Sequence, residues 1–202
     1  MTAVPGAAPP RGPRLLPRAE RRSSIVAGAA RAFAASGFDA TSMEEIAAAS
    51  GVTKLILYRH FESKEELYRS ILEAVSSRLG AEVASAIDAG RRRGVIVPAF
   101  LAVAREDPDG FRLLWRHSSR EPKFAGYAEE VHGAAVAFAR ALLGSRITDG
   151  TVLDWAAPTI VAFLVEAVLV WLDQGDISAD GRFTELTTNS LEALVATWSA
   201  SA

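Results

Sequence analysis

Four side chains that can bind the phosphates or base edges of a nucleic acid lie close together in the sequence: Thr53, Lys54, Tyr58 and His60. With Thr53 as its N-cap, the segment that follows is expected to form a helix of about two turns, ending near His60. Such a helix fits the major groove of B-DNA, where its N-terminal residues reach base edges. The spacing therefore predicts a recognition helix. A plainer interpretation stays open for Tyr58, as a half-buried core aromatic, and for His60, as an ordinary surface histidine.

The residues before this helix have the pattern of a helix-turn-helix unit. Ala47 is small enough for a close helix crossing, and Gly51, four residues later, can adopt the positive φ that the turn needs. Apolar side chains that could lock the crossing are available at Ile46, Val52 and Leu57. We therefore expect two short helices, one before Gly51 and one after it.

Three consecutive apolar residues, Leu55, Ile56 and Leu57, occupy the centre of the predicted recognition helix. Successive helical residues are separated by about 100°, so the three side chains fan across about 200°. A buried stripe on a surface helix is often only a little over 100° wide. At least one of the three is therefore expected to face away from the core. We expect Leu57 to be buried, Ile56 to face the groove and Leu55 to flank it, with Ile56 placed to contact a thymine methyl group.

Residues from about 22 to 72 resemble the DNA-binding domain of the tetracycline-repressor (TetR) family of bacterial transcription regulators. The matching residues are Ala32-Phe33, Ser36-Gly37-Phe38, Thr41-Ser42-Met43, Ile46-Ala47, Gly51-Val52-Thr53, Leu57-Tyr58, His60-Phe61 and Ser63-Lys64-Glu65-Glu66-Leu67. The pair Leu55-Ile56 departs from the family, which often has a small residue and a small hydroxyl there.

The resemblance implies a cytoplasmic homodimer whose two recognition helices read a palindromic operator in double-stranded DNA, and whose C-terminal domain binds a small-molecule effector. By carry-over, seven positions are expected to contact DNA: Ser42, Thr53, Lys54, Ile56, Tyr58, His60 and Lys64. Lys64 is also singled out by its own position. A cation in the first turn of a helix is mildly unfavourable, which favours a phosphate partner for it.

Helical periodicity and turn signals predict an all-α chain of about nine helices. The expected helices are 18–36, one from 43 to before Gly51, 54–60, 64–89, 95–105, 108–117, 122–143, 151–174 (with Pro158 as a kink or the true start) and 181–199. The predicted organisation is a disordered tail at 1–17, a helix-turn-helix domain at 18–62 and a helical ligand-binding and dimerisation domain at 63–202. The Pro-rich tail does not resemble a signal peptide, and a basic arm that touches DNA is the alternative for it.

Composition restricts the function further. Residues 1–70 carry ten Lys/Arg against seven Asp/Glu, whereas the whole chain has a net charge of −2. The N-terminal part of the chain is therefore basic, and the part after residue 70 is acidic. The absence of cysteine excludes disulfides, thiolate metal sites and a cysteine nucleophile, and suits a reducing compartment. No apolar run is expected to span a bilayer, since Pro158, Thr159 and Glu166 interrupt the longest candidate, 156–172.

The second half of the chain is rich in aromatic and apolar residues that could line a cavity. The candidates for an effector pocket are Phe111, Leu114, Trp115, Phe138 and Phe163, with Glu166 as a polar anchor. Core packing is the alternative for each apolar residue, and a solvent-facing position is the alternative for Glu166. Residues 161–171 are apolar nearly all round the helix, and with Leu191, Leu194, Val195 and Trp198 they suggest a dimer interface formed by the helices near 151–174 and 181–199. The basic run Arg91 to Arg93 is expected to interact with the C-terminus of the long fourth helix.

These patterns favour a ligand-responsive transcriptional regulator, foremost a repressor, released from its operator by a small apolar or amphipathic effector. Two alternatives stay open: a helical ligand-binding or interaction module that does not bind DNA, and a helical-bundle enzyme. The three histidines show no metal spacing, and no nucleophile elbow or phosphate loop occurs. We therefore expect no catalytic residues, no metal and no cofactor.

Overall fold

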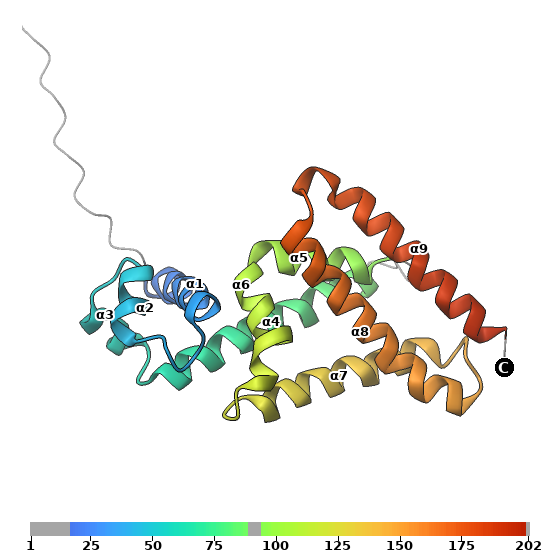
Figure 1. Cartoon of the computed structure of the whole chain (residues 1–202), viewed down its shortest axis with the longest axis horizontal. Coiled ribbons are helices and arrows are strands. Elements are labelled where there is room, and N and C mark those ends of the chain that lie inside the picture. The colour runs from blue at the N-terminus through green and yellow to red at the C-terminus, as the bar shows by residue number, and fades with distance from the viewer. Residues whose placement is uncertain (1–16, 89–93, 201–202) are drawn as a thin grey trace, which may run out of the picture.

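Capping residues and glycines divide the chain into nine α-helices in the computed structural model, which describes residues 17–88 and 94–200. No strand occurs within these two ranges, which confirms the predicted all-α class. Helices α1 (Arg18–Ser36), α2 (Met43–Ala49) and α3 (Lys54–His60) gather at one end of the molecule, and α4 (Lys64–Asp88) runs from there into the remaining helices (Figure 1). The expectations for residues 1–16 of the tail and for Arg91 to Arg93 lie outside the described residues.

Local sequence explains where the first helices begin and end. Ser42 and Glu45 form a complete capping box at the start of α2, and the Thr53 hydroxyl accepts a hydrogen bond from the backbone N–H of Ile56 at the start of α3. Gly37 and Gly51 have positive φ angles of 80° and 65°, which an L side chain rarely adopts. The predicted bounds of the first three helices therefore agree with the structure closely.

Buried apolar side chains from α1 to α4 form the core of the helix-turn-helix end. The fully buried members include Ile25, Phe33, Ile46, Leu57 and Leu67. Helices α1 and α2 approach so closely that a Cβ added to Gly28 would lie 2.3 Å from the Ser50 Oγ. This packing fixes α3 against α2 and leaves one face of α3 in solvent.

The second half of the chain consists of α5 (Ile96–Glu106), α6 (Pro108–Arg112), α7 (Ala125–Leu143), α8 (Gly150–Gln174) and α9 (Asp180–Ser199). The predicted helix 108–117 is α6 followed by a π-helical turn at Leu113–His117, and a 3-10 turn at Ser118–Arg120 comes next. Helix α7 begins a few residues later than predicted because the Glu121 carbonyl closes a turn by accepting from the N–H groups of Phe124 and Ala125. Pro158 neither starts nor ends α8 but lies inside it.

Helix α8 is long and apolar enough to cross a membrane by length and composition alone, so the expectation that no segment meets that test was wrong. Over the whole helix, the polar groups of Thr159 and Glu166 and the ring of Pro158 are outweighed by the aliphatic residues around them. One helix of this kind is weak evidence for a membrane span, since core helices of soluble proteins have the same composition. Here α8 packs against α5, α7 and α9, and this packing accounts for its buried apolar face.

Candidate nucleic-acid interface and internal cavity

Four of the seven side chains that we expected to contact DNA are exposed, on α3, at its N-cap and at the start of α2. Thr53, Lys54 and Tyr58 are exposed, and Ser42 is exposed at the start of α2. Tyr58 is 44% exposed, a value that fits both a side chain that contacts DNA and the alternative of a half-buried aromatic. These side chains come from the N-terminus of α2 and from α3, the arrangement that places base-reading groups and phosphate-binding groups along one groove.

The Leu55-Ile56-Leu57 run divides differently from our expectation. Leu57 is fully buried, as predicted, but Leu55 is the side chain that faces solvent, with 64% of its surface exposed. Ile56 is half-buried and packs against the core. Leu55 is therefore more exposed than Ile56, contrary to our expectation, because the apolar contact of α3 with the core extends from Leu57 to Ile56.

Lys64 has partners within the chain, which the expectation of a phosphate partner did not include. Its Nζ donates to the carbonyl oxygens of Phe38, Asp39 and Thr41 at 2.7, 3.2 and 3.1 Å. It also lies 4.5 Å from the centroid of the Phe38 ring. An ammonium group has three N–H donors, and all three are used here. Lys64 thus ties the start of α4 to the connection between α1 and α2.

Lys54 differs from Lys64 because its surroundings are open. Its ammonium pairs with the Glu44 carboxylate of α2, and both side chains are more than half exposed. This hydrogen bond lowers the pKa of Glu44 and raises that of Lys54. An exposed pair of this kind contributes little to stability, so a phosphate can compete for Lys54 at small cost.

His60, at the C-terminal end of α3, faces a cluster of cations from α1. Partial burial, followed by the charges of Arg18, Arg21 and Arg22, lowers the pKa of His60 below its ordinary value of 6.5. Arg22 is held in place over the Phe61 ring, 4.5 Å from its centroid, and by a hydrogen bond to the Ser70 hydroxyl. The positive charge at this end of α3 suits a phosphate backbone.

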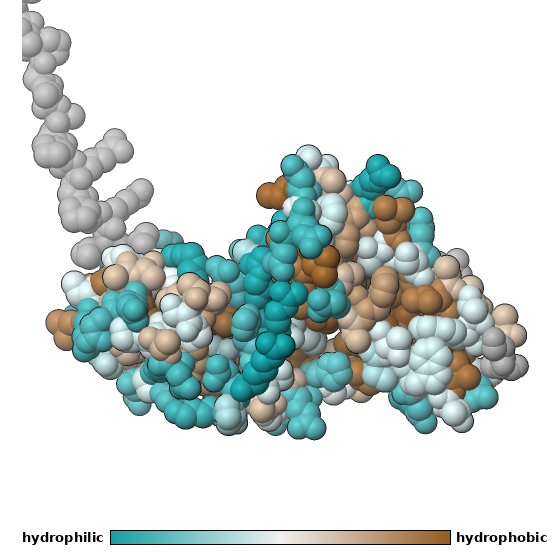
Figure 2. Space-filling model, in the orientation of Figure 1, coloured by the Kyte–Doolittle hydropathy of each residue, from teal (hydrophilic) through white to brown (hydrophobic). Residues whose placement is uncertain are grey.

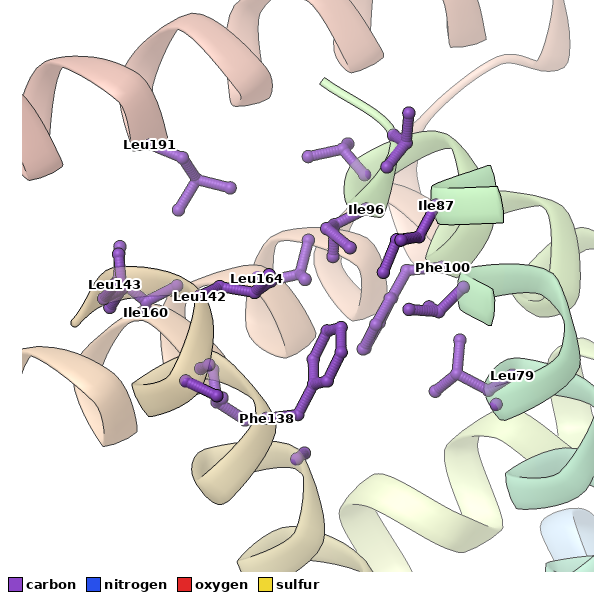
Figure 3. Close-up of a pocket in the computed structure, with 18 of the residues that line it drawn as sticks. Leu79, Ile87, Ile96, Phe100, Phe138, Leu142, Leu143, Ile160, Leu164 and Leu191 are labelled. Carbon is purple, nitrogen blue, oxygen red and sulfur yellow. The ribbon is translucent and has the colours of Figure 1, made fainter. Parts of the chain in front are cut away.

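A cavity of about 850 Å³ lies in the C-terminal half, between α4, α5, α7, α8 and α9. Figure 3 shows Leu79, Ile87 and Phe100 toward one end and Leu143, Ile160 and Leu191 toward the other. Its volume is within the range of about 300–1,000 Å³ typical of small-molecule sites, and such sites are lined mainly by apolar side chains. The arrangement can therefore bury an apolar molecule of considerable size.

Two of the six predicted pocket residues, Trp115 and Phe138, line this cavity. Phe111 and Leu114 are packed in the core instead, so for them the alternative interpretation was right. Phe163 lies on the outer face of α8 and is 37% exposed. Glu166 is also exposed, and its carboxylate lies 3.5 Å from the Arg116 guanidinium, so it is a surface ion-pair partner and not a polar anchor in the pocket.

Most residues that line the cavity were not among the six predicted pocket residues. The remaining walls include Leu79, Val83 and Ile87 of α4, Phe100 of α5, and Ile160 and Leu164 of α8. Leu191 and Val195, which we assigned to a dimer interface, also line the cavity. The spacing of the α4 residues marked a buried stripe, but no signal in the sequence distinguishes a stripe that faces a cavity from one that faces filled core.

Two polar atoms on the cavity residues are buried without a hydrogen-bond partner in the described part of the chain: Trp115 Nε1 and Thr188 Oγ1. Leaving such atoms unsatisfied costs free energy. Among the same described residues, no group of three or more His, Asp or Glu side chains could hold a metal ion. The lining of the cavity is otherwise mainly apolar.

Comparison with known proteins agrees with this geometry. A family model described as bacterial regulatory proteins of the tetR family matches residues 25–71, which extend from α1 into α4. An uncharacterized HTH-type transcriptional regulator of Mycobacterium tuberculosis is 30% identical over 152 residues, covering 72% of this chain and 73% of that protein. The chain belongs to the TetR family. It is a helix-turn-helix transcriptional regulator, like these relatives.

Other TetR-family members give a more detailed comparison. The HTH-type transcriptional activator FasR of Mycolicibacterium smegmatis is 38% identical over 120 residues, but the match covers only 57% of this chain and 54% of FasR. A TetR-like regulator from Rhodococcus sp. RHA1 has a TM-score of 0.75 at 22% identity, covering 89% of this chain and 96% of that one. AibR, solved in complex with isovaleryl coenzyme A and operator DNA, has a TM-score of 0.64 at 21% identity and covers 85% and 97% of the two chains.

Proposed function

We propose that this TetR-family regulator is a repressor that binds a palindromic operator as a homodimer and is released by a small apolar or amphipathic effector. The observation that carries the proposal is the presence, in one chain, of an exposed recognition helix and a separate apolar cavity of about 850 Å³. The proposed DNA-binding unit is residues 18–62, the proposed effector and dimerisation unit is 63–202, and the proposed location is the cytoplasm.

The proposed DNA contacts follow from exposure. Ser42, Thr53, Lys54 and Tyr58 present polar groups to solvent, and His60 lies at the basic end of α3. Leu55 joins them as the exposed apolar residue, whereas Ile56 contributes only at the edge of the core. Apolar contact with a thymine methyl is thus proposed for Leu55 in place of Ile56.

The proposed dimer interface is the outer face of α8 and α9. Four large apolar side chains on these helices are exposed: Trp155 at 47%, Phe163 at 37%, Val170 at 42% and Leu186 at 56%. Figure 2 shows apolar residues gathered on the C-terminal helices of the face in view. Monomeric soluble proteins rarely expose large contiguous apolar patches, so a second copy of the chain is the proposed cover.

The effector proposal is supported by the cavity and by one structural relative. AibR was solved with isovaleryl coenzyme A bound. The walls of the cavity here are almost entirely aliphatic or aromatic, which suits an acyl chain. Binding would shift the population of dimers toward one whose recognition helices no longer match successive major grooves, about 34 Å apart.

The proposal is tested with the intergenic DNA upstream of the gene that encodes the protein. We expect a dimer by light scattering and salt-dependent operator binding by fluorescence anisotropy. Binding that is insensitive to salt, or absent at every palindrome, would favour the alternative of an interaction module without DNA binding.

Activation of transcription is the second candidate function, because the relative FasR is named as an activator. Transcription of the operator template in vitro, with and without the protein, distinguishes repression from activation.

A further inference from the structure

Only two side chains that line the cavity in the described part of the chain carry a charge, and they form a pair. Arg146 Nη1 lies 3.1 Å from Glu192 Oε2. Arg146 belongs to the connection between α7 and α8, and Glu192 belongs to α9, so the pair joins two separate elements at the edge of the cavity. Their side chains are 37% and 42% exposed, so water reaches both groups.

This charged pair lies at one end of an elongated apolar space. Leu142 and Leu143 immediately precede the connection that holds Arg146, and together with Leu191 they form the end of the cavity opposite Leu79 and Phe100 (Figure 3). Along α7 the lining extends from Val131 to Leu143, a rise of about 18 Å that leads to the connection holding Arg146. A ligand that fills the cavity lengthwise would therefore place one terminus beside Arg146.

In the Arg146–Glu192 pair, the anionic group of a ligand can replace the Glu192 carboxylate. Exposed ion pairs contribute little to stability, so replacing the Glu192 carboxylate by another anion costs little. A guanidinium presents a planar fork of donors that binds a carboxylate or a phosphate with two parallel hydrogen bonds. Glu192 then occupies the position that the charged end of a ligand would take.

We propose that the effector is an elongated apolar chain ending in an anionic group, a carboxylate or a phosphate, and that Arg146 binds this group in competition with Glu192. This inference rests on the proposed function of the cavity. Arg146 is then the residue that selects for an anion. Glu192 is an internal competitor that weakens binding of the same anion.

The test uses three dodecyl compounds that share one chain and differ in the terminal group: dodecanoate, dodecyl phosphate and dodecanol. Binding of each to the full chain is measured by isothermal titration calorimetry at neutral pH, below the micelle concentration. We expect the wild type to bind at least one anion about fivefold more tightly than dodecanol. The anion whose affinity exceeds that of dodecanol by the larger factor identifies the terminal group of the effector.

Variants assign the preference to its residues. Arg146→Ala should abolish the preference for the anion and leave dodecanol affinity unchanged, while Arg146→Lys should keep part of it. Glu192→Gln should increase the preference by removing the competitor. Arg140→Ala is the matched control, because Arg140 forms a surface pair with Asp154 and does not line the cavity. If Arg146→Ala does not fold, Arg146→Lys and Glu192→Gln decide the question.

The outcomes separate the two proposals. Equal affinities of the wild type for dodecanol and both anions, or an equal loss of all three affinities in Arg146→Ala, would overturn the role of Arg146 while leaving an apolar effector cavity in place. Failure of all three compounds to bind the wild type would overturn the apolar effector cavity itself.

Discussion

The ring of Phe124 stacks on the ring of Tyr68, with centroids 4.4 Å apart and planes inclined by 29°. Phe124 directly precedes α7, which forms one wall of the cavity, and Tyr68 lies near the start of α4, just after the recognition helix. Both rings are buried, and the Phe38 ring packs edge-on against each of them at 5.2 Å. This aromatic contact, together with the ion pair between Lys123 and Glu65, joins the cavity wall to the helix-turn-helix end.

Phe124→Leu should therefore weaken the coupling between effector and operator. The smaller side chain keeps the site apolar but removes the ring stacking, and we expect the coupling free energy to fall by about 1 kcal/mol. The measurement compares the operator Kd with and without a saturating dodecyl ligand. Phe111→Leu is the control, because Phe111 is equally buried and lies outside this contact. An unchanged effector response in Phe124→Leu would refute the route through α7.

Gly28 and Gly133 should respond oppositely to replacement by alanine. A Cβ at Gly28 would lie 2.7 Å from the Ser50 Cα, so α1 and α2 must separate, and we expect the free energy of unfolding to fall by about 2 kcal/mol. Gly133 lies in the middle of α7 with nothing within 4 Å of the added Cβ, so Gly133→Ala should gain about 0.5–1 kcal/mol. Urea denaturation measures both. A tolerated Gly28→Ala would mean that the helix crossing is looser than the structure shows.

Lys64→Gln and Lys54→Gln should separate a structural lysine from a phosphate-binding one. Lys64→Gln breaks three hydrogen bonds to carbonyl groups and should lower the free energy of unfolding by about 1–2 kcal/mol without changing the salt dependence of operator binding. Lys54→Gln should leave stability nearly unchanged but reduce the slope of log Kd against log salt concentration by about 0.9 for each operator half-site. The reverse assignment of slopes would restore Lys64 as the phosphate contact.

Operator binding should strengthen as the pH falls through the titration range of His60. Burial and the arginines of α1 hold its pKa below 6.5 in the free protein. A nearby phosphate favours the protonated imidazole and raises this pKa in the complex, so binding takes up a proton and gains affinity as the pH decreases toward the free-state pKa. Anisotropy titrations between about pH 5.5 and 8 would show this gain. His60→Gln should flatten the profile, whereas His132→Gln, an exposed position on α7, should not.

Leu55→Ser and Ile56→Ser should differ in what they damage. Ile56 packs against the core, so its replacement should lower the free energy of unfolding by about 1 kcal/mol. Leu55 is exposed, so its replacement should leave stability intact but weaken binding to operators in which a contacted thymine is present. Replacing each thymine by uracil tests this in the wild type. If the affinity loss in Leu55→Ser is the same for thymine and uracil operators, the methyl contact is excluded.

Much of the fold could be predicted from the sequence because its signals are local. The capping box at Ser42 and Glu45, the Thr53 cap and the glycines at 37 and 51 act within one turn of chain, and each ends or starts a helix where predicted. The burial of Leu57 followed from the same local geometry. The later boundaries were less accurate where a π-helical turn and a 3-10 turn follow α6.

The tertiary structure decided which side of each helix meets solvent, core or cavity. Periodicity gives the angle between Leu55 and Ile56 but not the rotation of α3 against its neighbours, so the sequence did not show that Leu55 is the more exposed of the two. The Lys64 ammonium was predicted to await a phosphate because its helix was considered alone, whereas three carbonyl groups from the α1–α2 connection surround it. The cavity is formed by residues from five helices far apart in the sequence, and an aromatic residue in filled core, such as Phe111, has the same local pattern as one beside a cavity, such as Trp115. Local sequence determines the helices, and only their packing determines what each helix face contacts.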